Sequence, residues 1–254
     1  MRRTSLAAAV ITLASSGFCL TGAASAASSA ISHHPRIPAK AVHNAGWASS
    51  NWSGYAKSGN YSSATGRWVV PSVSKTRHAS YSSAWVGIDG FTNSSLIQTG
   101  TESDWYNGSA HYNAWWEILP AAETRITNFA VHPGDVMTAS VSRISGNSWR
   151  ITISDTTNGG SFTTTQNYTG PGTSVEWVEE APTVGGRVAP LAHYSSPDLF
   201  DPGTANGGNP GLLVSDGGTM VQKRATVSTP SVPDRDTDGF NMAYGATAPA
   251  PPTS

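Results

Sequence analysis

The chain has 254 residues, of which 38% are hydrophobic, 9% aromatic and only 12% charged. An average soluble domain carries about 25% charge, so coiled coils and long surface helices are not expected. Nine tryptophans, eight tyrosines and six phenylalanines supply enough apolar surface for a core, which excludes a disordered chain. The formal net charge is −1 and no run of Lys and Arg exceeds two residues, so the basic face of a nucleic-acid-binding protein is missing.

The first 26 residues have the pattern of an export signal. Arg2 and Arg3 precede an apolar stretch over residues 6–20, and a small-x-small cleavage site follows at 24–26. The apolar stretch is too short to cross about 30 Å of hydrocarbon, so no membrane span is expected. The only cysteine, Cys19, lies in this segment, so disulfides and thiol chemistry are excluded from the processed chain. These features predict a secreted, extracellular protein.

The rest of the chain divides into three segments by composition. Residues 27–44 are rich in Ala, Ser, His and Pro and indicate a linker or short pro-segment. Residues 45–246 form the expected domain. Residues 247–254 read Thr-Ala-Pro-Ala-Pro-Pro-Thr-Ser and predict a disordered tail.

Short alternating runs separated by turn residues predict an all-β domain. Trp149, Ile151 and Ile153 alternate with polar residues, and the Asn-Gly-Gly turn at 158–160 predicts a hairpin over 148–166. Residues 137–141 alternate in the same way. Further strands are expected at 52–57, 65–70, 82–89, 95–101, 110–118, 173–180, 219–228 and 239–244. The span 200–218 is rich in Gly, Pro, Asn and Asp and predicts a long loop. This spacing is typical of a β-sandwich or barrel.

The common hydrolase signatures are absent from the sequence. It has no Gly-x-Ser-x-Gly motif and no His-Glu-x-x-His motif. His33, His34 and His43 fall in the segment before the domain, and the other histidines stand alone. A Ser-His-Asp triad could be assembled only by free choice among dozens of serines. We therefore expect no cofactor and no metal site.

Several polar residues stand inside strands that are otherwise apolar. Alternation places Trp85 and Asp89 on one face of their strand, and Gln98 lies in the apolar run 96–99. Glu117 lies between Trp116 and Ile118. Such groups are costly to bury without partners, so they form either a hydrogen-bonded network, a solvent-facing strand face or the lining of a cleft. Their repeated occurrence beside tryptophan favours a cleft.

Seven segments stand out between residues 51 and 180. In chain order they are Asn51-Trp52-Ser53-Gly54-Tyr55, Trp68-Val69-Val70-Pro71, Ala84-Trp85-Val86-Gly87-Ile88-Asp89-Gly90, Ile97-Gln98-Thr99-Gly100, Asp104-Trp105-Tyr106, Tyr112-Asn113-Ala114-Trp115-Trp116-Glu117 and the Glu176 strand. In these segments and their order, the chain resembles the glutamic peptidases, also called eqolisins.

The resemblance implies a two-sheet antiparallel β-sandwich of the lectin or glucanase type, a concanavalin-like jelly roll. It implies an acid endopeptidase with Gln98 and Glu176 as the catalytic pair. It also implies substrate-binding residues around the cleft, at Trp85, Asp89, Asn113, Trp115 and Glu117. The sequence departs from the fungal pattern in having Asn113 where an aspartate is usual, Leu119 where a tyrosine is usual, and none of the fungal disulfides.

Carboxyl and amide groups suit peptide hydrolysis without a metal or thiol. Glu176 as a carboxylate can take the proton of a water and return it to the leaving nitrogen. The Gln98 amide can hold the water through its oxygen and stabilise the oxyanion through its nitrogen. The expected partners are protein or peptide substrates, with neither nucleic acid nor membrane, and a monomer is expected.

Two alternatives remain at this point. A glycoside hydrolase on a similar sandwich would use Glu117 and Glu176 as its acid and nucleophile, with their carboxyls about 5–9.5 Å apart. A non-catalytic, lectin-like carbohydrate-binding protein would need neither. Gln98 separates the three, because only the peptidase has a specific use for that amide.

Overall fold

The computed structural model describes residues 30–40, 46–196 and 198–253, so the expected signal segment 1–26 lies outside the described residues. The described chain contains β-strands, a single 3-10 turn at Val214–Asp216 and no α-helix. None of its helices is long and apolar enough to cross a membrane.

The strands follow one another closely along the chain. They are β1 (Ile31–Ser32), β2 (Trp47–Ser49), β3 (Trp52–Ser58), β4 (Ser63–Val69), β5 (Ser83–Ile88), β6 (Ile97–Tyr106), β7 (Ser109–Ile118), β8 (Thr124–Ile126), β9 (Val136–Ser145), β10 (Ser148–Asp155), β11 (Ser161–Asn167), β12 (Ser174–Glu180), β13 (Thr183–Val184), β14 (Arg187–Val188), β15 (Asp198–Ala205), β16 (Gly217–Gln222), β17 (Ala225–Pro230) and β18 (Phe240–Tyr244).

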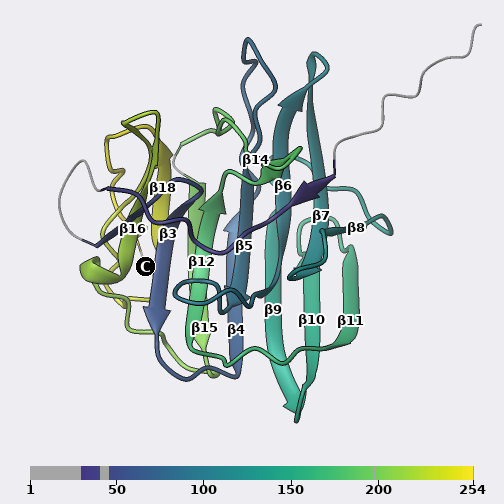
Figure 1. Cartoon of the computed structure of the whole chain (residues 1–254). Helices are drawn as coiled ribbons and strands as arrows, with labels where there is room; N and C mark the ends of the chain where they lie inside the picture. Colours follow the sequence, from purple (N-terminus) through teal and green to yellow (C-terminus); the bar gives the residue numbers. More distant parts are fainter. Residues whose placement is uncertain (1–29, 41–45, 197, 254) are drawn as a thin grey trace, which may run out of the picture.

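The strands form a two-layer antiparallel sandwich, as expected. One hydrogen-bonded path runs β11-β10-β9-β4-β15-β18-β17-β16-β3-β12-β5-β6-β7-β8, and it folds back so that β4 and β9 pack on β5 and β9 also packs on β6. Outside this path, β2 pairs with β16 in parallel. Figure 1 shows the long curved strands side by side, with the purple N-terminal segment crossing in front of them.

The core lies between the two layers and follows the predicted alternation. Trp149, Ile151 and Ile153 of β10 are fully buried, and Val86 and Trp177 face them from the other layer as parts of the same apolar cluster. The predicted hairpin is β10 paired with β11, with Ile153 opposite Phe162. Because successive strand residues point to opposite faces, the neighbours of Val86 and Trp177 point away from this core.

The structure corrects two sequence expectations near the C-terminus. The strand expected at 219–228 is two strands, β16 and β17, because Lys223 and Arg224 adopt positive φ values of 50° and 68° and make a turn. The loop expected at 200–218 begins later, because β15 extends to Ala205 and buries Phe200 between Trp68 and Phe240. Pairing between β15 and β4 shifts register after Phe200, which accommodates the Pro-Gly pair that suggested a loop.

The C-terminal residues from 246 to 253 form no strand. Asn241 Nδ2 donates to the carbonyl of Ala250 at 2.9 Å, so this segment lies against β18.

Candidate functional site

A row of polar residues crosses four neighbouring strands on the face opposite the core. Glu176 of β12 is in register with Gly87 of β5, Gly87 with Gln98 of β6, and Gln98 with Glu117 of β7. Residues in register share one face of a sheet. The side chains of Glu176, Gln98 and Glu117 are all fully buried. The register therefore brings three residues singled out from the sequence onto one line.

Gln98 and Glu117 are hydrogen-bonded to each other. Gln98 Nε2 donates to Glu117 Oε2 at 2.7 Å, which fixes the orientation of the amide. The other end of the amide, Gln98 Oε1, is buried and has no hydrogen-bond partner in the described residues. Burial raises the pKa of Glu117 to about 8. The amide thus presents an unused acceptor on a face where a water or a carbonyl group could use it.

Glu176 is buried without a partner. Neither of its carboxyl oxygens makes a hydrogen bond to another described residue. Burial raises its pKa well above the ordinary glutamate value; the nearby Ser174 hydroxyl opposes this rise, and Asp89 adds to it. An unpaired carboxyl in such a place is costly, and perturbed groups of this kind concentrate at functional sites.

A small residue separates Glu176 from Gln98. Gly87 lies between them, and a side chain there would collide with the six-membered ring of Trp85 and crowd Cβ of Gln98. Two strand spacings separate the backbones of Glu176 and Gln98, about 9.6 Å. Their side chains therefore lie on either side of Gly87, and the Trp85 ring packs over that glycine.

Two tryptophans form the next row along the same face. Trp85 is in register with Gly100, and Gly100 with Trp115. Trp85 Nε1 donates to Glu180 Oε2 at 2.9 Å, and Trp115 Nε1 donates to Ser83 Oγ at 3.0 Å. These bonds hold both rings against the sheet, so Trp85 and Trp115 lie where they were expected, beside the Gln98 row.

Asp89 has a different environment from the one expected. It follows β5 with a positive φ of 73°, so strand alternation does not extend to it. Its carboxylate accepts hydrogen bonds from Tyr168 Oη at 2.6 Å, from the backbone N–H groups of Gly172 and Thr173, and from Asn93 Nδ2. The Thr173 hydroxyl also donates to Oδ1 at 3.2 Å, so five donors surround the carboxylate. Its observed contacts hold the 168–173 loop beside the Glu176 end of the row.

Asn113 belongs to a third row on this face, one that contains two glutamates that sequence analysis did not assign. Asn113 is in register with Glu102, Glu102 with Ser83, and Ser83 with Glu180. Glu102 and Glu180 are fully buried. A sequence signal existed, because Glu102 follows Gln98 by four residues and Glu180 follows Glu176 by four. An even separation along a strand puts both members of each pair on the same face.

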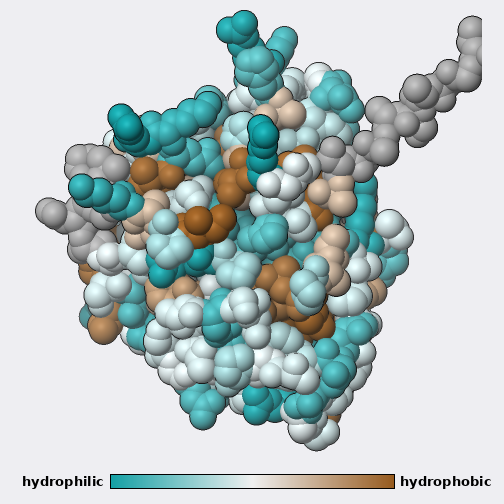
Figure 2. Space-filling model, viewed as in Figure 1, coloured by the Kyte–Doolittle hydropathy of each residue, from teal (hydrophilic) through white to brown (hydrophobic). Residues whose placement is uncertain are grey.

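Residues 30–40 cross this face as a strap. The N-terminal strand β1 pairs with β13, and the strap continues to Arg36, whose N–H donates to the carbonyl of Gly90 at 3.0 Å. Asn51 Nδ2 donates to the carbonyls of His34 and Pro35. Figure 2 shows the strap side of the molecule with only small apolar patches, broken up by polar residues.

His33 is the residue by which the strap enters the polar rows. It is fully buried, its N–H lies 3.2 Å from both oxygens of Glu117, and its ring stacks on Trp115 at 3.7 Å. Nδ1 lies 3.0 Å from Glu180 Oε2, and Nε2 lies 3.1 Å from Glu102 Oε1 and 3.3 Å from Glu123 Oε2. Sequence analysis placed His33 in a linker or short pro-segment, and no local pattern could have revealed these distant partners.

Glu102, Glu123 and Glu180 form a socket around the His33 ring, and the charges of these four residues depend on one another. Burial alone would lower the pKa of His33, but Glu180, Glu102 and Glu123 outweigh it and raise that pKa well above the usual histidine value. Burial raises the pKa of Glu102 to about 7, although His33 opposes the rise. The socket is thus occupied by an imidazolium among carboxyl groups.

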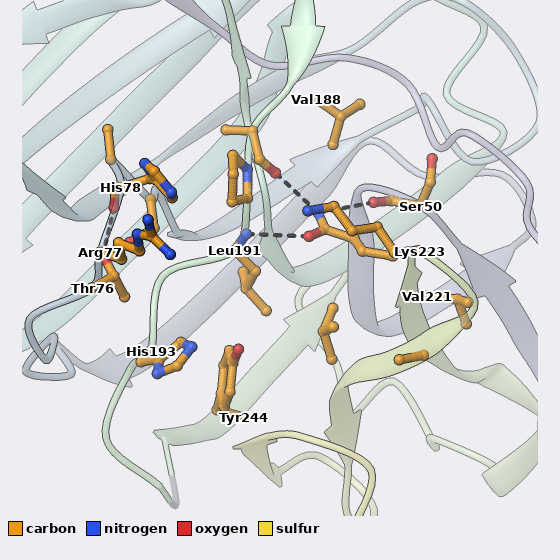
Figure 3. Close-up of a pocket in the computed structure, with 17 residues that line it drawn as sticks. Ser50, Thr76, Arg77, His78, Val188, Leu191, His193, Val221, Lys223 and Tyr244 are labelled. Atoms are coloured by element: carbon orange, nitrogen blue, oxygen red, sulfur yellow. Dashed lines mark hydrogen bonds between the residues drawn. The ribbon is translucent and has the colours of Figure 1, made fainter.

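An open pocket lies elsewhere on the molecule. It has a volume of about 630 Å³ and is lined by Arg77, Leu191, His193, Lys223 and Tyr244, among others (Figure 3). None of its described lining residues is an aspartate or glutamate. It therefore lacks the carboxyl chemistry of the polar rows, which are closed in this structure by the strap.

Comparison with known proteins agrees with the sequence resemblance. Residues 50–244 match the Peptidase A4 family. The chain is 30% identical over 186 residues to aspergillopepsin-2 of Aspergillus niger and 35% identical over 112 residues to scytalidopepsin B of Scytalidium lignicola. These matches span 63% and 43% of this chain, and 66% and 42% of the two relatives, so the chain covers less than two thirds of either.

Solved structures support the fold. A scytalido-glutamic peptidase structure with a transition state analog inhibitor superposes with a TM-score of 0.67 at 24% identity, covering 77% of this chain and 98% of the other. The aspergilloglutamic peptidase structure from Aspergillus niger superposes with a TM-score of 0.56 at 26% identity, covering 65% and 99%.

Proposed function

This chain belongs to the peptidase A4 family, and from that premise we propose that it is an acid endopeptidase acting on protein or peptide substrates. The observation that carries the proposal is the row in which Glu176, Gln98 and Glu117 share one sheet face across β12, β6 and β7. The row alone would suit several hydrolytic reactions, and the family match is what favours peptide hydrolysis among them.

Glu176 transfers protons, and Gln98 positions the water and stabilises the oxyanion. Glu176 as a carboxylate takes a proton from the water that attacks the scissile carbonyl, and as the acid it returns the proton to the leaving nitrogen. Gln98 Oε1, which has no partner among the described residues, positions the water. Its Nε2 donates to the developing oxyanion, in place of the bond now made to Glu117. Glu117 thus holds the amide ready before substrate arrives.

The remaining rows give substrate a surface to bind. Trp85 and Trp115 are held flat against the sheet and provide apolar walls on one side of the Gln98 row. Asn113 keeps a buried Nδ2 without a hydrogen-bond partner in the described residues, which suits it to bind a backbone carbonyl of substrate. Asp89 is a positioning residue, because its hydrogen bonds hold the 168–173 loop near Glu176.

Residues 27–44 act as a pro-segment in this account. The strap lies where a substrate chain would lie, with a backbone N–H on Glu117 and a ring on Trp115. Peptide substrate and strap cannot occupy the face together, so the strap must leave before turnover.

Protonation favours the strapped state. Glu180, Glu102 and Glu123 raise the pKa of His33 well above the usual histidine value, and His33 loses these partners when the strap leaves. The strapped state therefore binds this proton more tightly, and it is favoured as the pH falls toward the usual histidine pKa of about 6.5.

The two carbohydrate readings lack comparable support. Glu117 and Glu176 are separated by Gly87 and Gln98, a backbone distance of three strand spacings or about 14 Å. The Gln98 amide bonded to Glu117 stands between the two carboxyls that a glycosidase would need to face each other.

Digestion of a denatured protein by the chain lacking residues 1–44 tests the proposal. Glu176→Gln and Gln98→Ala are expected to abolish most cleavage. Glu179→Gln is the matched control, because Glu179 is an equally buried glutamate of the same strand on the opposite face. Equal loss of cleavage in all three folded variants would contradict the assignment. Export is tested separately by N-terminal sequencing of the secreted product, which should lack residues 1–26, and a monomer is expected in sedimentation.

A further inference from the structure

The turn between β17 and β18 carries a second group of carboxyls, far along the chain from the polar rows. Asp234, Asp236 and Asp238 alternate and are followed by Gly239. Alternating aspartates ending in glycine are the pattern of loops that supply oxygen ligands to Ca²⁺. Sequence analysis predicted no metal site because it searched for histidine and cysteine ligands.

The fold adds a carboxyl from another strand to this loop. Oxygens of Asp201 in β15, Asp234 and Asp238 all lie within 4.8 Å of one another. Two oxygens on opposite sides of a Ca²⁺ ion stand about 4.8 Å apart, which is twice a bond length of about 2.4 Å. Three ligand oxygens from two separate elements are therefore close enough for one ion to contact all of them.

Buried oxygens without a partner provide an independent indication. Asp234 is only 5% exposed, yet its Oδ2 makes no hydrogen bond to another described residue. Oδ1 of Asp238 is also buried and unpartnered there. A methyl group at Gly239 would collide with Asp234 Oδ2 and the Asp201 side chain, so glycine leaves both carboxyls room to converge. Buried carboxyl oxygens of this kind call for a cation or a proton.

Arg67 partly offsets the charge of Asp201, but no basic side chain in the described part of the chain forms an ion pair with any of the three carboxylates. The guanidinium of Arg67 donates to the backbone carbonyl of Asp201 at 3.0 Å. Burial, followed by repulsion from Asp236, Asp234 and Asp201, raises the pKa of Asp238 to about 6. Burial also raises the pKa of Asp201 and Asp234, and each of the three carboxyls opposes ionisation of its neighbours.

We propose that Asp201, Asp234 and Asp238 bind a Ca²⁺ ion that ties the 231–239 loop to β15. The backbone already joins these elements, since Gly203 N–H donates to the Asp238 carbonyl at 2.8 Å and Asp234 N–H to the Gly239 carbonyl at 3.0 Å. The ion would complete this link by replacing carboxylate repulsion with shared coordination. Calcium fits better than magnesium, which demands strict octahedral geometry and retains water. The site's role is stability of the folded chain and not peptide hydrolysis.

Calcium binding to the full chain at pH 7, after dialysis against a chelator, tests the proposal. Equilibrium dialysis should give one Ca²⁺ per chain. A site with a Kd of about 0.1 mM should raise the Tm by roughly 5–10 °C at 10 mM CaCl₂. MgCl₂ at the same concentration should give a clearly smaller shift.

Matched variants locate the ion. Asp234→Asn and Asp238→Asn should each lose most of the calcium-dependent Tm shift. Their metal-free Tm should not fall below that of the wild type, because a repulsive charge is removed. Asp216→Asn removes one negative charge at a different place, beside Lys57, and should retain the shift. Fewer than about 0.2 Ca²⁺ bound per wild-type chain at 5 mM, or equal shifts with Ca²⁺ and Mg²⁺ in every variant, would overturn the proposal.

Discussion

The stability of this protein should fall as the pH rises from 4 to 7, and Asp198→Asn should remove part of that fall. Glu179 of β12 and Asp198 of β15 are both buried, and none of their carboxyl oxygens has a donor among the described residues. Burial raises the pKa of each, and Asp198 raises that of Glu179 further. Groups with raised pKa values stabilise the fold below their unfolded pKa, about 4, and this contribution is lost as the pH rises through the folded pKa.

The size of the effect follows from proton uptake. If Asp198 holds one proton more in the folded chain than in the unfolded chain, stability changes by about 1.4 kcal/mol per pH unit. Over the three units from pH 4 to 7 the upper limit is about 4 kcal/mol. Asparagine cannot take up this proton, and its amide can donate to Glu179. The variant should therefore gain stability relative to the wild type on going from pH 4 to 7, by on the order of 10 °C in Tm.

Urea or thermal unfolding at pH 4 and pH 7 measures this difference, in a Gln98→Ala background that suppresses self-digestion. Asp155→Asn is a control variant for which the change in stability with pH should have the opposite sign. Burial would raise the pKa of Asp155, but hydrogen bonds from Asn158 and Thr157 outweigh it and lower the pKa. Its stabilisation is present above the unfolded pKa, so Asp155→Asn should lose more stability at pH 7 than at low pH. A constant stability difference between Asp198→Asn and wild type at both pH values would refute the reasoning.

Three further predictions concern the catalytic face. A synthetic peptide of residues 30–40 should inhibit the enzyme that lacks residues 1–44, and inhibition should be weaker at pH 7 than at pH 5. His33→Ala in the peptide should weaken inhibition at least tenfold, because the contacts of His33 with Glu102 and Glu180 are lost. Equal inhibition by both peptides would contradict the role of His33. Gln98→Ala should lower kcat by about 10²–10³ with little change in KM, measured on a soluble peptide, and an unchanged kcat would exclude the oxyanion role. Chelators and thiol reagents should leave peptide hydrolysis intact at temperatures well below the Tm, whereas activity lost in chelator and restored by zinc would indicate a metallopeptidase.

Most of the fold could be predicted from the sequence because strand alternation is a local property. The runs around Trp149 and Val86 repeat with period two, and their inward faces form the core as expected. Errors arose where a tertiary contact overrode local composition. Phe200 packs between two aromatic rings and extends β15 through Pro202 and Gly203, which had indicated a loop.

The candidate site could be predicted only in part. Gln98, Glu117 and Glu176 were identifiable because polar groups stood in apolar strands, and register places them in one row. The environments of Asp89 and His33 could not be predicted, because each depends on residues 79 or more positions away. A left-handed backbone turned Asp89 toward the 168–173 loop, and strand pairing of β1 carried His33 into the socket.

The most direct test of the carboxyl–amide site is the pH dependence of kcat/KM between about pH 2 and 8, on a peptide without titratable groups. It compares the chain lacking residues 1–44, with the wild-type sequence elsewhere, and its Glu176→Gln variant. The wild type should be most active on the acid side of neutrality, above the ordinary glutamate pKa of about 4.3, because burial raises the pKa of Glu176. Glu176→Gln should show only residual activity at every pH. A wild-type maximum at neutral or alkaline pH, or a Glu176→Gln variant with an unchanged profile, would contradict the assignment.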